Sequence, residues 1–406
     1  MRLSTRYRCV LVALFLIGPV FAAKLASAVT IEGRSSTQFI WYNDIIDGSK
    51  QYDLSQYLLA SVNNIDGNEK FSVKGYGKLD YDLKNGYLNS RLYYLYADYK
   101  GFLNAADVKL GRQFINLSAG SALVDGIEAD VNRIGPVGFV VTGGRDVIFG
   151  EETELSSHLY VAGAQAYYMG PRMAYIDLSY LRTYDDSAIA RDIIASSYKQ
   201  YFFDLLKGYA SVRYDLTAET FNEVLVGLKY FPTLNLMLTG EYYQSYPTFD
   251  STSIYSVFAV DRFNEYIARM DYTLAAWVDI SLAGSHEDFG EGGHAQLYEV
   301  GLRFRPTINT TIGVFHDKRW GYPGDLSGYK IYGDYGAIGK WKVSGGIDYD
   351  VYERDDMTGQ QTAKKYWAAG RYFFSKKISG SVRVEDNVNV NYSKDLQGRA
   401  TFDVDF

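Results

Sequence analysis

The sequence predicts an all-β fold, a transmembrane antiparallel up-and-down β-barrel of about 22 strands (18–22). Three observations predict it. Apolar and polar residues alternate with period two almost throughout the chain after residue 30, the pattern of strands with one apolar and one polar face. Tyrosine is abundant (38 residues), as suits a membrane-interface belt, whereas proline is scarce (7). The last segment, residues 396–406, reads as a complete strand that ends on a phenylalanine.

The first element of the chain is a secretory signal peptide. Its start carries three arginines, residues 9–23 are apolar, and residues 26–28 are the small residues of a cleavage site. We therefore predict a signal peptide over residues 1–28, cleaved after about Ala28, and a barrel over residues 29–406.

The composition of the mature chain excludes several classes of protein. Four of the 41 Lys and Arg residues and none of the 48 Asp and Glu residues lie in the first 28 residues. The mature chain thus has 37 basic and 48 acidic residues, a net charge of −11, which argues against nucleic-acid binding. Cleavage also removes Cys9, the only cysteine, and with it any disulfide or thiolate metal site. No later stretch of about 20 apolar residues could form a spanning helix.

The individual strands follow from regular alternation. In one of them Val343 and Ile347 share a face, and Lys342, Asp348 and Asp350 share the opposite face. The clearest such segments are residues 209–216, 222–230, 265–272, 342–353 and 377–385.

The connections between these segments are of two kinds. Short turns are expected at residues 169–172, 231–235, 305–309 and 374–377. Long polar loops are expected at residues 44–51, 147–157, 184–197, 247–262, 287–293, 318–327 and 354–361. Short turns at one rim and long loops at the other are typical of bacterial outer-membrane barrels, whereas the loops of a soluble β-sandwich or propeller would not sort in this way. The stretch 184–221 is ambiguous and could change the strand count by about two.

The C-terminal strand carries a resemblance of its own. Phe402, Val404 and Phe406 share its apolar face, and a strand of this kind resembles the signal that outer-membrane β-barrels present to their assembly machinery. The resemblance implies an outer-membrane location, both termini in the periplasm, and the assembly machinery and outer-membrane lipid as partners. We expect Phe406 to face lipid and the last strand to pair with the first, because an open sheet edge in hydrocarbon leaves costly unpaired backbone groups.

A second resemblance covers residues 95–144. Residues 109–113 (KLGRQ), 124–127 (VDGI) and 135–138 (GPVG) resemble a strand pair of Gram-negative porin-like proteins. The resemblance implies a porin, a water-filled channel for passive diffusion of small hydrophilic solutes or ions, and porins of this kind are commonly homo-oligomers. Some barrels in this broad group instead form a sleeve around a multihaem cytochrome for electron transfer across the outer membrane. That is the alternative function, although the mature chain lacks the N-terminal Cys-x-x-Cys of the long conduit barrels.

Charged residues on the polar faces are candidates for setting solute selectivity in the lumen. They are Arg213, Arg269, Arg303, Arg371, Arg383, Arg399, Asp348 and Asp350, together with Arg112 and Asp125. The simpler interpretation is that a hydrated lumen must be polar and that these charges pair across strands.

Arg112 needs a separate explanation. Strict alternation places it on the lipid face with Leu110, where a charge would cost about 2–4 kcal/mol at the bilayer midplane. We expect a bulge at Gly111 to turn Arg112 inward, so that Arg112 and Asp125 form a constriction or fold inward. The alternative is an arginine near the rim that reaches the headgroups. An inward fold of residues 116–134 would favour the porin, whereas a regular strand there would leave the sleeve open.

No enzymatic motif is present. The four histidines are not spaced as metal ligands. Ser285 and His286 are adjacent on a strand and point to opposite faces, so they cannot easily meet as a catalytic pair. We expect no enzymatic activity, no metal and no cofactor.

Overall fold

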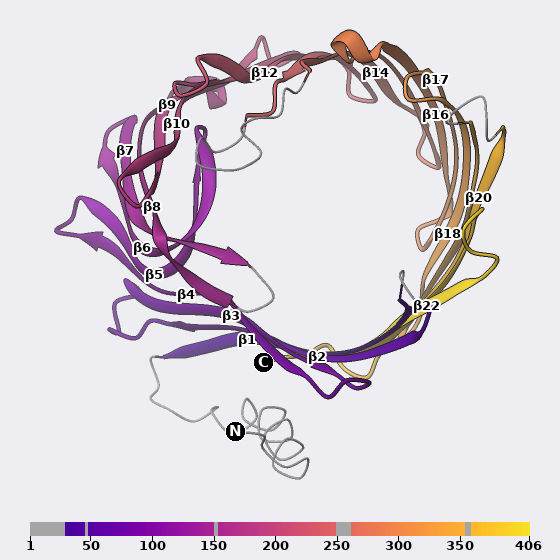
Figure 1. Ribbon diagram of the computed structural model, residues 1–406, viewed down its shortest axis with the longest axis horizontal. Helices are drawn as coiled ribbons and strands as arrows, with labels where there is room; N and C mark the ends of the chain where they lie inside the picture. The colour runs from indigo at the N-terminus through magenta and orange to yellow at the C-terminus, as the bar shows by residue number, and fades with distance from the viewer. Residues whose placement is uncertain (1–28, 45–47, 150–152, 249–260, 354–358) are drawn as a thin grey trace.

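The computed structural model is a closed β-barrel made of one 22-stranded sheet. It describes residues 29–44, 48–149, 153–248, 261–353 and 359–406. Each strand pairs antiparallel with the next in the sequence, and β22 pairs with β1 to close the ring (Figure 1). The predicted fold class and the strand count of 22 are confirmed. The predicted signal peptide lies outside the described residues.

The strand bounds are β1 Thr30–Asn43, β2 Lys50–Asn63, β3 Phe71–Asp82, β4 Leu88–Phe102, β5 Ala106–Leu117, β6 Gly120–Ile134, β7 Val137–Phe149, β8 Thr153–Met169, β9 Tyr175–Asp185, β10 Ala188–Phe202, β11 Leu206–Asp215, β12 Thr220–Thr233, β13 Leu236–Ser245, β14 Phe263–Ala275, β15 Val278–Asp288, β16 His294–Thr307, β17 Thr310–Gly321, β18 Asp325–Ile338, β19 Trp341–Glu353, β20 Gln361–Phe373, β21 Ile378–Val388 and β22 Asp395–Asp405. Two short 3₁₀ turns, η1 Pro171–Met173 and η3 Gly290–Gly292, lie in connections. No helix among the described residues is long and apolar enough to cross a membrane.

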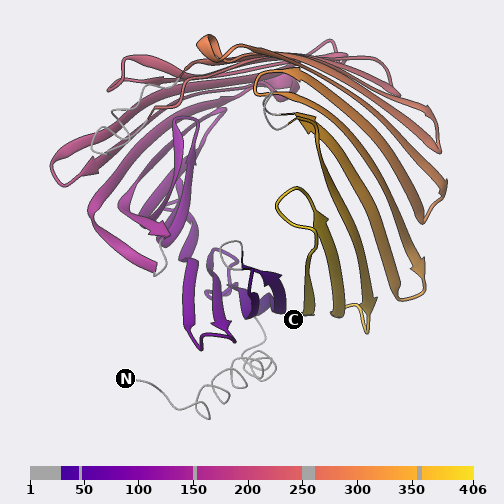
Figure 2. The same ribbon diagram turned by 45° about the vertical axis from the view of Figure 1, so that its right-hand side comes forward.

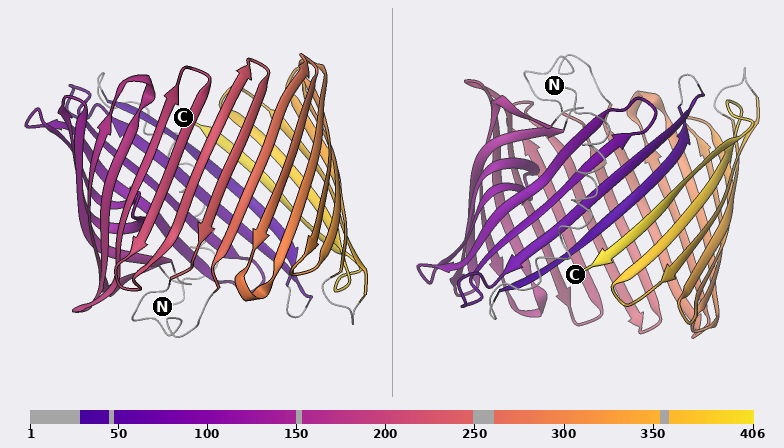
Figure 3. Two further views of the ribbon diagram at one scale, coloured as in Figure 1. Left: turned by 90° about the horizontal axis from the view of Figure 1, so that it is seen from above. Right: turned by 90° about the horizontal axis from the view of Figure 1, so that it is seen from below.

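The strands run at a slant between two rims (Figure 3). β1 starts and β22 ends at the rim that also carries the expected short turns, here called the short-turn rim. The predicted loop at 184–197 is wrong, because β9 and β10 pair through this region and only Asp186 and Ser187 connect them. Other strands also extend into predicted loops. In the loop predicted at 318–327, for example, only residues 322–324 separate β17 from β18.

The closing seam joins the two ends of the chain. Eight residue pairs, from Arg34–Asp405 to Trp41–Gly398, align β1 with β22. Beyond them the Gly33 amide donates to the Phe406 carbonyl (3.2 Å), and the Phe406 amide donates to the Gly33 carbonyl (3.1 Å). Figure 2 shows indigo β1 beside the yellow end of the chain. The prediction that the last strand pairs with the first is confirmed.

Large apolar side chains cover the outside of the barrel. Leu110, Val141, Leu178, Tyr266 and Ile331 are all exposed, which suits a surface that meets lipid. The neighbouring residue positions on the same strands point to the lumen and carry most of the charges. This apolar-out, polar-in alternation is the reverse of a soluble protein and leaves the lumen as the polar compartment.

Candidate functional site

The β5–β6 hairpin leaves the wall and enters the lumen. The ladder between β4 and β5 ends at Leu95–Arg112, and the ladder between β6 and β7 ends at Val124–Asp146. Residues 113–123, here called the inward hairpin, continue beyond these ends and lie inside the ring (Figure 1). An inward fold of residues 116–134 is the arrangement expected of a porin, and a regular strand there is the one that leaves the sleeve open. Their first part folds inward, and residues 124–134 continue as a wall strand.

An apolar cluster holds the inward hairpin against the inner wall. One face of the hairpin packs on β8, β9 and β10, and the buried side chains of this cluster are Ile115, Leu117, Ala119, Val124, Val161, Leu181, Ile193 and Ala195. Gly163 makes room for Leu117, since a Cβ at Gly163 would lie 2.7 Å from the Leu117 Cδ1. Each fully buried Leu or Ile contributes about 1.5–3 kcal/mol, so the cluster supplies the main energy of docking.

Polar contacts fix the tip of the hairpin. The Ala119 amide donates to the Ser179 hydroxyl at 2.7 Å. The Arg213 Nε donates to the Ser118 carbonyl at 2.7 Å, while its Nη1 pairs with Glu223 at 2.9 Å. These bonds satisfy backbone groups that the tip would otherwise leave without a strand partner. Arg213, predicted as a selectivity residue, therefore anchors the hairpin to the wall.

Glycines line the base where the hairpin bends away. Gly111 has φ +126°, and a Cβ there would lie 2.4 Å from the Leu95 carbonyl oxygen. On the next strands, a Cβ at Gly126 would lie 2.6 Å from the Gly144 Cα. The expected bulge at Gly111 is wrong, because the register of β5 continues through it on both sides. The whole hairpin turns inward instead of a single residue.

Arg112 and Asp125 form an ion pair at this base. The Arg112 Nε and Nη2 each donate to one Asp125 carboxylate oxygen at 2.8 Å, and Nη1 donates to the Leu92 carbonyl at 3.2 Å. The Arg112 side chain is only 11% exposed. The pair thus bridges β5, β6 and β4 at the point where β5 leaves β4, and its charges are compensated.

A second group of charges lines the lumen wall formed by β19–β22 and β1. We call it the basic arc, and it comprises Arg34, Lys342, Arg371, Arg383 and Arg399. Three of these arginines have carboxylate partners: Arg34 pairs with Asp405, Arg371 with Asp403 and Arg383 with Glu385. Within the described residues, Arg399 and Lys342 have no carboxylate partner. A cavity of about 340 Å³ is lined by four of the five basic side chains and one carboxylate, Asp334.

In these ion pairs the basic side chain is more exposed than its carboxylate partner. The Arg371 side chain is 39% exposed but that of its partner Asp403 only 10%. The Arg383–Glu385 and Lys365–Glu385 pairs show the same difference. Long basic side chains reach into the lumen, and the shorter carboxylates stay against the wall. The arc therefore presents positive charge to the lumen although the chain is acidic overall.

The other predicted selectivity residues also lie on lumen-facing strand positions, spread around the ring. Asp348 stands opposite Lys330 and Lys365 in the ladders, and Asp350 stands opposite Gly328. Arg269 lies on β14, and Arg303 lines a cavity at the short-turn rim. These four residues do not converge on one site.

The inward hairpin and the basic arc lie on opposite sides of the ring, and Arg34, Lys342 and Arg371 of the arc lie nearer the short-turn rim than the hairpin does. The hairpin packs on β8–β10, and β21, at the centre of the arc, lies half-way round the 22-stranded ring from β10. The lumen-facing side of the hairpin carries Phe114 and Asn116, which are uncharged and exposed. Sequence reasoning missed the docking residues. A signal was present, because Phe114, Ile115 and Leu117 make both faces of this strand apolar, as in strands buried on both sides.

No family model and no curated protein matches this chain. Solved structures are similar in fold. The P pilus usher (PapC) translocation pore has 10% identity, covers 93% of this chain and 99% of its own, and has a TM-score of 0.54. Two Pseudomonas aeruginosa proteins, OccK3 (OpdO) and OccK5 (OpdH), have 10% and 12% identity, cover 93% of this chain and 95% and 98% of their own, and have TM-scores of 0.45 and 0.46. The likeness to the usher pore and the closed 22-stranded sheet together give the chain the fold of outer-membrane β-barrels.

Proposed function

We propose that this chain is an outer-membrane channel for passive diffusion of small hydrophilic solutes, with a preference for anions. The observation that carries the proposal is the uncharged inward hairpin placed across the lumen from the basic arc. Such an arrangement narrows the path on one side and supplies positive charge on the other. The short-turn rim is then the periplasmic end, as in bacterial barrels of this kind.

The position of the inward hairpin also bears on the alternative that the barrel is a sleeve around a multihaem cytochrome. The inward hairpin occupies lumen space on the β8–β10 wall, and its contacts are made within this chain. No observation on the described residues favours a cytochrome in the lumen. Diffusion through a narrowed channel needs no enzymatic step, so we propose no enzymatic activity.

The test is the reversal potential of single channels in a planar bilayer under a KCl gradient. The refolded protein should give steady currents that favour chloride. Arg399→Ala should lower the ratio of anion to cation permeability about fivefold, because a unit positive charge at about 8 Å in water stabilises a monovalent anion, and destabilises a monovalent cation, by about 0.5 kcal/mol each. Arg371→Gln should also lower the ratio of anion to cation permeability.

The control is Arg172→Ala, a change of the same charge in a turn of the short-turn rim. It should leave the permeability ratio unchanged. A wild-type channel that favours potassium, or a folded barrel that conducts nothing, would contradict the proposal.

A further inference from the structure

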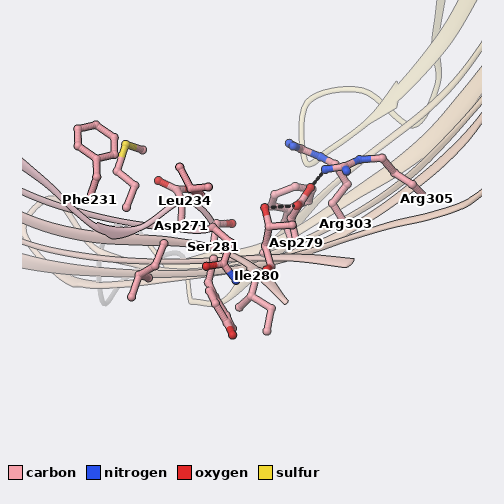
Figure 4. Close-up of a pocket in the computed structure, with 15 residues that line it drawn as sticks. Phe231, Leu234, Asp271, Asp279, Ile280, Ser281, Arg303 and Arg305 are labelled. Carbon is pink, nitrogen blue, oxygen red and sulfur yellow. Dashed lines mark hydrogen bonds and ion pairs between the residues drawn. The ribbon is translucent and has the colours of Figure 1, made fainter. Parts of the chain in front are cut away.

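A cavity of about 440 Å³ lies at the short-turn rim, away from both the inward hairpin and the basic arc. Its walls come from β12 to β17 (Figure 4). This volume is in the range of sites for small ligands and suits a molecule of amino-acid size. None of the candidate residues singled out above lies here except Arg303.

The cavity holds two carboxylates and two guanidinium groups, so its formal charge is balanced. Arg305 and Asp279 form an ion pair, and the Thr273 hydroxyl donates to the Asp279 Oδ1 at 2.9 Å. These two charges are compensated within the wall. The other two, on Asp271 and Arg303, form no hydrogen bond or ion pair with any residue that the structure describes.

Asp271 and Arg303 lie on strands two apart, and Arg303 stands opposite Asp279, the ion-pair partner of Arg305, in the ladder. Asp271 stands opposite Ser281, which stands opposite Gly301, and Arg303 follows Gly301 by two residues on β16. Two strand spacings and an offset of two residues place their backbones about 12 Å apart, which is too far for a direct ion pair without rearrangement. In Figure 4, Asp271 lies on one side of the cavity, with Arg303 and Arg305 on the other.

The cavity also has an apolar part. A Cβ at Gly301 would lie 2.7 Å from the Phe315 Cε1, so the absence of a side chain at Gly301 lets the Phe315 ring lie close to the sheet. The ring stacks on Tyr332 with centroids 5.8 Å apart. Phe231 and Met237 add further apolar surface.

We propose that this cavity is a binding subsite for zwitterionic solutes of the α-amino acid class with an apolar side chain. Asp271 accepts hydrogen bonds from the ammonium group, Arg303 donates to the carboxylate, and the side chain lies near Phe315. The site lies where a permeating solute leaves or enters at the short-turn rim. It refines the proposed diffusion function and rests on it only in requiring a hydrated lumen.

The test is calorimetric binding of three probes to the refolded wild-type barrel. They are L-phenylalanine, 3-phenylpropionate, which lacks the ammonium group, and phenethylamine, which lacks the carboxylate. L-Phenylalanine should bind about tenfold more tightly than either analogue, since each analogue leaves one charged hydrogen bond unmade. Equal binding of the three probes would overturn the proposal without any mutation.

Variants then assign the two ends of the solute. Arg303→Gln should remove the advantage of L-phenylalanine over phenethylamine, and Asp271→Asn should remove its advantage over 3-phenylpropionate. The matched control is Lys207→Gln, a charge change at the same rim on β11, outside the cavity. Heat-modifiable migration on gels confirms that each variant is folded. Unchanged discrimination in both folded variants would overturn the assignment.

The binding and current measurements distinguish a failure of the proposed subsite from a failure of the proposed channel function. Binding of L-phenylalanine by a barrel that carries no current would support the subsite and reject the channel. Chloride-selective current from a barrel that does not discriminate the probes would do the reverse.

Discussion

Leu117 shows how one side chain determines the shape of the lumen. Its side chain lies between Gly163 and Leu181 on the inner wall and is almost fully buried. On the same hairpin, Phe114 points away from this wall and is 53% exposed. The alternation of a strand thus gives two neighbouring apolar residues opposite roles, one in docking and one in lining the lumen.

Leu117→Ala should weaken docking of the inward hairpin. Truncating a buried leucine costs about 2–5 kcal/mol, here taken from the free energy that holds the hairpin to the wall. Single-channel recordings should show added open-channel noise and new conductance levels. Phe114→Ala on the exposed face is the control and should keep a quiet baseline. Equal noise in the two variants would mean that Leu117 does not hold the hairpin.

The inward hairpin is the element that distinguishes this lumen from a plain cylinder. Its two strands pair only with each other beyond Arg112 and Val124, so their partners are the apolar cluster and the bonds at the tip. Glycines at its base permit the close backbone approach that the bend requires. The Arg112–Asp125 pair then joins the bent hairpin to β4 through the Leu92 carbonyl.

Shortening this element should widen the channel. Gln113 and Val124 are paired in the ladder, so replacing residues 114–123 with Asn-Gly closes the hairpin by a two-residue turn. We expect a higher single-channel conductance from a barrel that still shows heat-modifiable migration. An unchanged conductance would show that the hairpin does not narrow the path of the ions.

At the scale of the whole molecule, the seam between β1 and β22 closes the barrel, so that neither strand leaves an unpaired edge in the membrane. The seam ends in the two hydrogen bonds between Gly33 and Phe406, with the Phe406 ring beside Gly33 on the outer face. Since a net hydrogen bond contributes about 0.5–1.5 kcal/mol, the last residue contributes directly to closure. The assembly signal of Phe402, Val404 and Phe406 remains a prediction.

Deletion of Phe406 should lower the free energy of unfolding in urea by about 1–3 kcal/mol, the value of two hydrogen bonds. A variant with one serine added after Phe406 keeps both bonds and should match the wild type in this measurement. If the assembly machinery recognises a phenylalanine at the last position, the added serine should lower the yield of folded barrel in cells. Equal free energies of unfolding for the deletion variant and the wild type would mean that Phe406 does not stabilise the closed barrel.

Signals within the sequence are enough to predict the barrel. Alternation of period two, the two kinds of connection and the terminal strand are local signals, and membrane burial requires the strands that they predict to close into a ring. The lumen-facing positions of Arg371, Arg383 and Arg399 follow from the same alternation. The stretch 184–197 was misread because charged residues such as Asp185 and Arg191 suit both a polar loop and a lumen-facing strand.

What lies inside the ring depends on contacts that form only in the folded barrel. Alternation assigns a residue to a face of its strand, but it does not say whether that strand stays in the wall. The inward hairpin depends on contacts between Leu117 and residues on β8 and β9, which are distant in sequence and have no local signature. The placement of the hairpin opposite the basic arc likewise depends on the circumference of the closed barrel, a property of all its strands together.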